Sequence, residues 1–293
     1  MGKKSFVSVP NFSTSDPKII EQLLACFQSH ADLKLLDFSS DQDHNRTVIT
    51  VQGSSKILIC ALVNALQISV QKIDLRTHIG AHPRIGALDV LPIVPTKNTT
   101  LKEADTVAKQ LALACNLAIP DLPIIFYEFS ASTPQNRNLD TIRQNEWQEL
   151  NEKLHAGLQV DLGPNRLHPT AGALVIGARK PLIAFNVNLQ TSDVTIAKKI
   201  AQKIRESSGG LPGVKAIGLY LNSTRQAQVS MNLVDYTKTN IDTVYLAISK
   251  YAKHYGVALA HSEIIGALPE DALTQAFAHF INLDNSQIKT IKD

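Results

Sequence analysis

The spacing of apolar residues predicts a first block of alternating strands and helices. Alternating apolar and polar residues are typical of strands, and an apolar stripe repeating every three to four residues is typical of a helix. Asp16 and Pro17 have the residue types that favour the N-cap and first turn of a helix. Strands are predicted at 5–13, 33–39, 46–53, 87–95 and 122–129, and helices from Pro17, over 54–71 and over 101–115.

A second block repeats this order of elements near the C-terminus. Strands are predicted at 182–189, 214–221, 227–236 and 257–268, and helices at 192–207, 240–256 and 269–281. The tract 130–172 between the blocks is polar and rich in turn residues, with one helical piece at 139–154. We therefore expect this tract to connect two lobes.

The order βαββαβ occurs twice, which indicates an α+β fold of two tandem ferredoxin-like subdomains with mainly antiparallel sheets. The predicted subdomains are residues 1–178 and 179–293. A chain of 293 residues is long enough for two hydrophobic cores.

Composition excludes several classes of protein. Apolar residues make up 44% of the chain and charged residues 19%, as in globular proteins. The net charge of +3 is small and dispersed, which argues against nucleic acid as a partner. The chain has neither a signal-peptide pattern nor eighteen consecutive apolar residues, so we expect a cytoplasmic protein that does not insert into membranes. The three cysteines, Cys26, Cys60 and Cys115, lie far apart in apolar helical segments, and we expect them to be reduced and buried.

The stretch HIGAHPRIGALDV, residues 78–90, is dense in groups that can carry chemistry. His82 titrates near neutral pH and can act as a general acid or base, and Pro83 stiffens the backbone beside it. Arg84 offers a planar fork for a carboxylate, and Gly80 and Gly86 permit close approach of a ligand or another strand. The alternative is that the histidines only cap backbone groups of the loop.

A second polar cluster lies between two predicted strands, in DFSSDQDHNRTV at 37–48. Its carboxylates could orient an imidazole or bind an ammonium group, and its amide and guanidinium could bind carboxylate oxygens. It lacks the glycine and distal glutamate of a calcium loop, so we expect no metal site; a solvated acidic turn is the alternative. The members are Asp37, Asp41, Asp43, His44, Asn45 and Arg46.

The third candidate is the loop 163–172, which precedes an apolar strand and contains little side-chain bulk at its ends. Such a loop could admit a flat ring, but it matches neither the dinucleotide-binding nor the triphosphate-binding glycine pattern. Its residues are Gly163, Pro164, Asn165, Arg166, Leu167, His168, Pro169, Thr170, Ala171 and Gly172.

Taken together, four motifs make the chain resemble the formiminotransferase family over nearly its whole length. They are VPNFS, DQDHNRTV, HIGAHPRIGALDVLPIVP and DLGPNRLHPTAGALVIGARKPLIAFNVNL. The resemblance implies that the two ferredoxin-like sheets face each other across a folate channel, and that the protein is a homodimer. It implies transfer of a formimidoyl group between N5 of tetrahydrofolate and the amino group of L-glutamate, a step of histidine degradation. We expect no cyclodeaminase domain and no metal.

The resemblance also assigns roles to residues. It makes His82 the catalytic general acid and base and the loop 163–172 the folate-contacting segment. The expected substrates are tetrahydrofolate, in its 5-formimidoyl or 5-formyl form, and L-glutamate or N-formimidoyl-L-glutamate. Asp37, Asp41, His44, Asn45, Arg46 and Arg84 are expected to orient the imidazole and to hold glutamate or the formimidoyl nitrogen.

Two segments depart from the family pattern. Thr14-Ser15-Asp16 stands where the family has Glu-Gly-Arg, and Glu128-Phe129-Ser130 where Gly-Glu-Ala is common. Two alternatives therefore stay open: a formyltransferase from 5-formyltetrahydrofolate to glutamate, and a catalytically silent folate-binding relative. A purely structural assembly protein is disfavoured, because it would need no clustering of polar residues in these loops.

Overall fold

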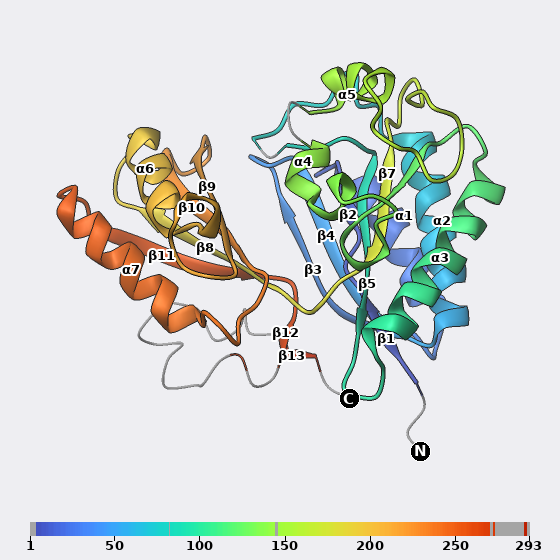
Figure 1. Ribbon diagram of the computed structural model, residues 1–293, viewed down its shortest axis with the longest axis horizontal. Helices are drawn as coiled ribbons and strands as arrows, with labels where there is room; N and C mark the ends of the chain where they lie inside the picture. Colours follow the sequence, from blue (N-terminus) through green and yellow to red (C-terminus); the bar gives the residue numbers. More distant parts are fainter. Residues whose placement is uncertain (1–3, 82, 144–145, 270–271, 273–289, 292–293) are drawn as a thin grey trace. The chain divides into compact units, whose positions relative to one another are not determined.

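The chain forms two compact units that meet in sequence between Arg179 and Lys180. The structure, a computed structural model, describes residues 4–81, 83–143, 146–269, 272 and 290–291. Figure 1 shows both units as sheets with helices attached, and each unit is described separately below.

The first unit is built on a mixed sheet of seven strands, which contains the βαββαβ order expected from the sequence. Strand β4 pairs with β1, β2 and β3, β5 pairs with β1 and β2, and all of these pairings are antiparallel. The strands are β1 (Phe6–Ser8), β2 (Asn11–Phe12), β3 (Lys34–Asp41), β4 (Arg46–Gly53), β5 (Leu88–Pro95), β6 (Ile124–Phe126) and β7 (Leu174–Ala178).

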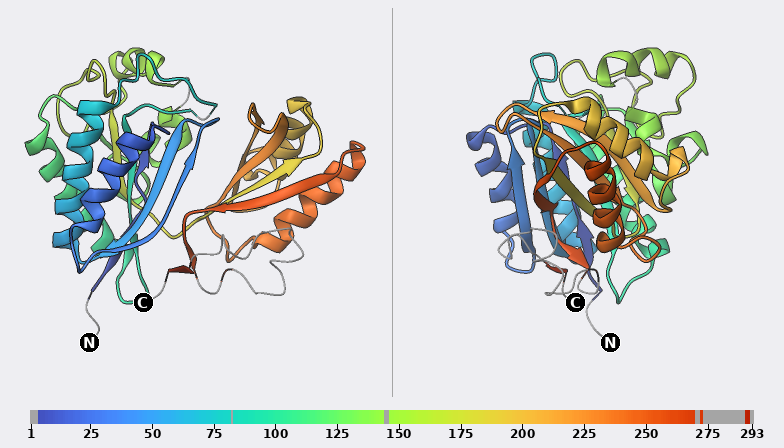
Figure 2. Two further views of the ribbon diagram at one scale, coloured as in Figure 1. Left: turned by 180° about the vertical axis from the view of Figure 1, so that it is seen from behind. Right: turned by 90° about the vertical axis from the view of Figure 1, so that its left-hand side faces the viewer.

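Three helices cover one face of this sheet, as the views in Figure 2 show: α1 (Pro17–Gln28), α2 (Ser55–Lys72) and α3 (Leu101–Ala118). Their apolar stripes and the facing strand residues form one core, for example Leu23 of α1, Leu62 of α2 and Ile49 of β4. Local signals fix where the helices begin. Asp16 accepts a hydrogen bond from the backbone N–H of Lys18, and Thr100 and Glu103 form a reciprocal capping box on α3.

Two shorter helices, α4 (Leu139–Arg143) and α5 (Glu146–His155), pack on the other face beside β5, β6 and β7. Ile142 and Leu150 from these helices join Val90, Ile125 and Val175 from the three strands in a second buried cluster. The predicted helix over 139–154 corresponds to α4 and α5, and residues 144 and 145 between them are outside the described residues.

The expectation that 130–172 merely connects two lobes is wrong. This tract and the strand that follows it belong to the first unit, because β7 inserts between β5 and β6 and runs parallel to both. Parallel pairing joins segments some eighty residues apart, and no local pattern reports such a partner. The predicted strand over 122–129 is shorter than expected, since β6 ends at Phe126 and a 3₁₀ turn, η1 (Glu128–Ser130), follows.

The second unit repeats the arrangement with four antiparallel strands in the order β11, β8, β10, β9. Its strands are β8 (Ile183–Leu189), β9 (Val214–Leu221), β10 (Gln226–Leu233) and β11 (Leu259–Ile265), and its helices are α6 (Val194–Ile204) and α7 (Ile241–His254). Both helices share one core with the sheet, which includes Phe185, Ile200 and Ile248. The predicted helix at 269–281 falls almost wholly outside the described residues.

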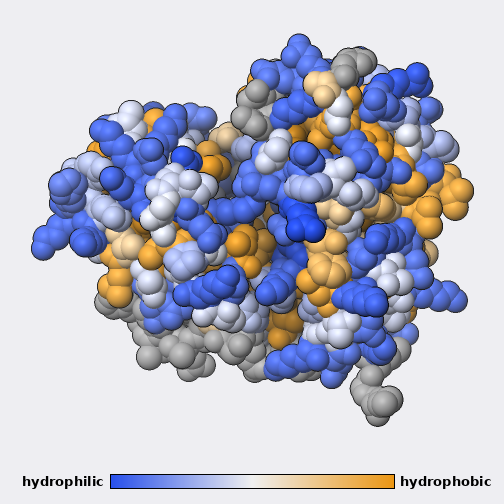
Figure 3. All heavy atoms as spheres, viewed as in Figure 1, coloured by the Kyte–Doolittle hydropathy of each residue, from blue (hydrophilic) through white to orange (hydrophobic). Residues whose placement is uncertain are grey.

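Surface exposure corrects one expectation about the cysteines. Cys115 is buried and Cys26 is half-buried, but Cys60 is exposed on α2; all three are free thiols. Figure 3 shows a mainly hydrophilic surface with scattered apolar patches. Within the described part of the chain, no helix has the length and hydropathy needed to cross a membrane.

Candidate active site

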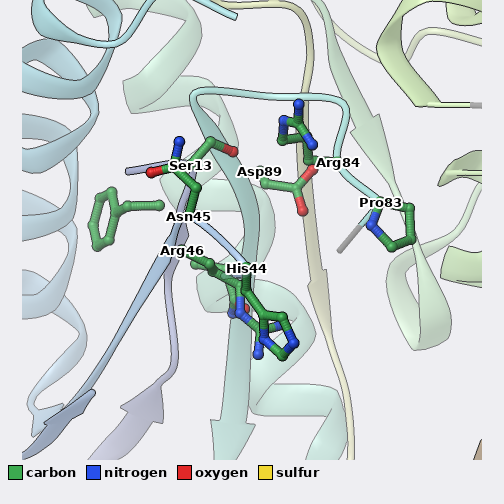
Figure 4. A pocket seen from close by; sticks show the side chains of 9 residues that line it. Ser13, His44, Asn45, Arg46, Pro83, Arg84 and Asp89 are labelled. Carbon is green, nitrogen blue, oxygen red and sulfur yellow. The ribbon is translucent and has the colours of Figure 1, made fainter. Parts of the chain in front are cut away.

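A small pocket at the beginning of β5 gathers segments that lie far apart in the sequence (Figure 4). The end of β2, the β3–β4 turn and the segment after His82 each contribute side chains. The pocket is lined by Asn11, Phe12, Ser13, His44, Asn45, Arg46, Pro83, Arg84 and Asp89. Four of the sequence candidates therefore lie together in this lining: His44, Asn45, Arg46 and Arg84. Asp37 lies within β3, opposite Thr50 of β4, and is not among the lining residues.

Asn45 is the last residue of the β3–β4 turn, directly before β4 begins. Its φ of 45° is in the left-handed region, which asparagine tolerates better than most residues. Its side-chain Oδ1 accepts hydrogen bonds from the amide (2.9 Å) and hydroxyl (3.0 Å) of Ser15, and Nδ2 donates to the carbonyl of Ile79 at 3.0 Å. One side chain thus joins the start of α1 to the loop that leads to His82.

The same turn is fixed to the 78–81 loop through its backbone. The amide of Ala81 donates to the carbonyl of Asp43 at 2.9 Å, and His78 Nε2 lies 2.9 Å from the carbonyl of Asn45. A carbonyl can only accept, so His78 carries a proton on Nε2. Burial lowers the pKa of His78, which favours the neutral ring. His78 therefore has the loop-capping role that the sequence left open for both histidines.

His82, the expected catalytic residue, is outside the described residues, but both of its neighbours in sequence are described. Ala81 is held by the β3–β4 turn, and Pro83 lines the pocket. The buried Arg84 donates from Nη2 to the carbonyl of His78 at 2.7 Å, which braces the loop internally. Gly80 is required here, because a Cβ at that position would lie 2.3 Å from the carbonyl oxygen of His44.

Asp89 is a pocket residue that the sequence reasoning missed. Its Oδ1 accepts a hydrogen bond from the amide of Ile85 at 2.8 Å, and its Oδ2 forms an ion pair with Arg143 of α4. The signal was present, since a carboxylate inside the apolar run ALDVLPIVP needs a buried partner. Ser13, whose hydroxyl donates to the carbonyl of Gly86 at 2.7 Å, was missed as well.

The loop 163–172 approaches the site through its last residues. Gly86 and Gly172 form an antiparallel β-bridge. The amide of Ala87 donates to the carbonyl of Ala171, and the amide of Ala173 donates to the carbonyl of Ile85, both at 2.9 Å. Gly172 has a φ of 69°, and a Cβ on it would lie 2.1 Å from the Ile85 carbonyl oxygen. The third and fourth sequence motifs are thus paired directly with each other.

His168 holds this loop in shape. Its Nδ1 accepts a hydrogen bond from the amide of Ala171 at 3.0 Å, and its backbone bonds reciprocally to Gly172. Burial lowers the pKa of His168, opposed by the charge of Asp121, so the neutral ring is favoured. Pro169 and Gly163, Asn165 and Arg166 are exposed, and no residue from 163 to 172 lines the pocket.

The two segments that depart from the family pattern have different positions. Ser15 contacts Asn45, and the carbonyl of Thr14 accepts a hydrogen bond from Thr47 Oγ1 at 2.7 Å, so the first segment supports the site directly. Glu128 follows the C-terminal end of β6. Through β7, Phe126 of β6 is level with Leu91 of β5, so Glu128 lies further along the sheet than Asp89. Glu128 is not among the residues that line the pocket.

The arrangement offers a positioned loop, one half-buried arginine and several buried polar groups. A guanidinium in such a pocket suits a substrate that carries a carboxylate. Among the described residues, no group of three or more histidine, cysteine, aspartate or glutamate side chains is placed to hold a metal ion.

Comparison with known proteins gives matches along the whole chain. Residues 5–179 match the formiminotransferase domain, N-terminal subdomain, and residues 184–293 match the formiminotransferase domain. A glutamate formimidoyltransferase of Streptococcus pyogenes serotype M1 is 39% identical, covering 94% of this chain and 93% of that protein. A glutamate formimidoyltransferase of Thermoplasma acidophilum is 36% identical, covering 94% of this chain and 92% of that protein. A formimidoyltransferase-cyclodeaminase of Dictyostelium discoideum is 36% identical over 94% of this chain but only 53% of that protein.

Proposed function

The chain belongs to the formiminotransferase family, and from this premise we propose that it transfers a formimidoyl group between N5 of tetrahydrofolate and the amino group of L-glutamate. The observation that carries the proposal is similarity over nearly the full length of two relatives, both of them glutamate formimidoyltransferases. The convergence of the first three sequence motifs around one pocket supports it.

His82 is the proposed general acid and base. With N-formimidoyl-L-glutamate as donor, the N5 lone pair attacks the formimidoyl carbon, and the bond from that carbon to the glutamate nitrogen breaks. N5 loses one proton and the leaving amine gains one, so a single imidazole that accepts the first can deliver the second. The reaction needs no oxidant, reductant or metal, and the reverse direction uses the same steps.

Arg46 is the proposed anchor for a glutamate carboxylate. It lines the pocket, it is half-buried, and a guanidinium binds a carboxylate through two parallel hydrogen bonds. Asn45 and Arg84 have most of their described contacts within the loops, so their proposed role is to hold the segment around His82 in place. Asp37 lies in β3 opposite Thr50 and is not among the residues that line the pocket, so we assign it no role there.

Tetrahydrofolate supplies the nucleophilic N5, and the loop 163–172 is its proposed contact. Within this loop, the last residues pair with Ile85–Ala87, whereas Gly163, Asn165 and Arg166 are exposed and accessible to a ligand. This division fits a loop whose one end braces the site while the other meets the substrate. The 5-formimidoyl form is the proposed product, and a homodimer the proposed assembly.

The test is a coupled assay with tetrahydrofolate and N-formimidoyl-L-glutamate, which follows the absorbance of the acid-generated methenyl product. We expect His82→Ala to lower kcat by about 10²- to 10⁴-fold, the usual contribution of acid–base catalysis, while folate affinity by calorimetry is retained. The matched control is His254→Ala, an exposed histidine at the end of α7, which should leave kcat unchanged.

The same assay separates the two alternatives. Turnover with 5-formyltetrahydrofolate and glutamate, but none with N-formimidoyl-L-glutamate, would indicate a formyltransferase. Folate binding without turnover of either donor would contradict the enzyme and leave a binding protein.

A further inference from the structure

Asp89 is a buried carboxylate with two distinct partners. Its side chain is 6% exposed, its Oδ1 accepts the hydrogen bond from the Ile85 amide, and its Oδ2 pairs with Arg143, whose side chain is 11% exposed. A carboxylate removed from water is costly unless a charge and hydrogen bonds compensate it. The Arg143 guanidinium therefore pairs with the buried Asp89 carboxylate in the position where that carboxylate accepts a hydrogen bond from the Ile85 amide.

Ile85 connects the Asp89–Arg143 ion pair to the pocket, because its amide donates to Asp89. It follows Pro83 and Arg84 directly, it is fully buried, and its carbonyl accepts a hydrogen bond from Ala173. Its side chain packs in the same cluster as Ile142, the neighbour of Arg143 on α4. Three kinds of contact therefore hold the segment after His82: the backbone bond to Ala173, the packing of the Ile85 side chain, and the ion pair of Asp89 with Arg143. Arg143 lies outside the sequence motif.

Arg143 does not line the pocket, and the sequence analysis assigned it no role. We propose that Arg143 is a positioning residue for the proposed transfer reaction, which acts through Asp89 to hold the segment that follows His82. This inference rests on the proposed function for its kinetic consequence, while its structural consequence at Ile85 is independent of the reaction. Without Arg143, the buried carboxylate of Asp89 has lost its ion pair, so we expect it to turn toward water. It then no longer accepts the hydrogen bond from the Ile85 amide.

The kinetic test compares Arg143→Ala, Arg143→Lys and Asp89→Asn with the double variant that combines Arg143→Ala and Asp89→Asn. A small misplacement of a catalytic group lowers rate by up to about 10²-fold, so we expect Arg143→Ala to lower kcat about 10- to 100-fold with folate Kd changed less than about threefold. Arg143→Lys keeps the charge and should recover most of kcat. Because Arg143 acts through Asp89, the double variant should be no slower than the slower single variant.

Lys109→Ala is the matched control, since Lys109 pairs with Asp105 on the exposed side of α3 and should show wild-type kcat. If Arg143→Ala alone does not fold, the double variant still tests the proposal, because it contains no unpaired buried charge. Equal kcat for Arg143→Ala and wild type, or fully additive losses in the double variant, would overturn the proposal.

Hydrogen exchange of peptides covering residues 83–88 supplies the second readout. We expect faster exchange in Arg143→Ala and Asp89→Asn than in wild type and in Lys109→Ala, because the Ile85 amide loses its acceptor geometry. If the variants exchange faster but the wild-type protein shows no turnover, the positioning role of Arg143 stands and the proposed transferase function is refuted. If exchange is unchanged in the variants of an active enzyme, only the positioning role of Arg143 is refuted.

Discussion

Asn45 combines a backbone requirement with a side-chain requirement at one position. The left-handed φ limits which residues fit without strain, and the three side-chain hydrogen bonds limit which residues can join Ser15 to Ile79. The two requirements can be separated, because glycine satisfies the first and not the second, whereas alanine satisfies neither.

We expect Asn45→Gly and Asn45→Ala both to lower kcat/KM at least about tenfold, because the loop that leads to His82 loses its tether. Asn45→Ala should also be less stable than Asn45→Gly by about 1 kcal/mol, the cost of a β-carbon in the left-handed region. Urea denaturation measures the difference in unfolding free energy. Wild-type kcat/KM in Asn45→Gly would show that the side-chain bonds contribute nothing to the site.

At the residue scale, the sequence predicted several of the polar residues that line the site, but it did not predict which groups they contact. Asn45, Arg46 and Arg84 do lie together around the pocket. Their detailed partners were hidden, because Asn45 bonds to a backbone carbonyl 34 residues away and Asp89 to a side chain 54 residues away. A sequence shows that a buried carboxylate needs a cation, but it does not show which one.

At the scale of elements, the helix starts were predictable because their signals are local. Asp16, Thr100, Asp193 and Asn240 each accept a hydrogen bond from an amide two or three residues further on. The insertion of β7 between β5 and β6 was not predictable, because a continuous apolar run fits an edge, a centre or a connection equally well. The helix starts could be found from local signals, whereas the place of β7 in the sheet could not.

The pairing of two loops through Gly86 and Gly172 gives a prediction at this scale. A Cβ on Gly86 would lie 2.0 Å from the carbonyl oxygen of Ala173, which is backbone and has little freedom to move. We expect Gly86→Ala to lower the unfolding free energy by about 1–3 kcal/mol, the usual cost of overpacking, and to lower kcat, because residues 85–87 shift against 171–173.

Thermal denaturation and the coupled assay check this expectation. The matched control is Gly209→Asn, at an open position with a φ of 81°, which should change stability by less than about 0.5 kcal/mol. Wild-type stability of Gly86→Ala would mean that the two loops are not held as closely as the structure describes.

At the scale of the whole molecule, each of the two units has a main hydrophobic core between its sheet and its helices. One joins the first sheet to α1, α2 and α3, and the other joins the second sheet to α6 and α7. The repeated order of elements predicted two such blocks, because each block must bury its own apolar faces. The repeat does not predict how a substrate engages the two units, since element order says nothing about ligand contacts.

Ligand binding can test whether both units engage folate. Because each unit has its own core, we expect two unfolding transitions in calorimetry of the free protein. A ligand that binds only folded protein, at about 100 times its Kd, stabilises what it binds by about 2.7 kcal/mol. The family resemblance implies a folate channel that uses both sheets, so saturating 5-formyltetrahydrofolate should raise both transitions, while glutamate alone at the same concentration should raise neither comparably. A rise of the first transition alone would confine folate to the unit that contains the pocket and refute the shared channel, because a ligand cannot stabilise a unit that it does not contact directly or through the other unit.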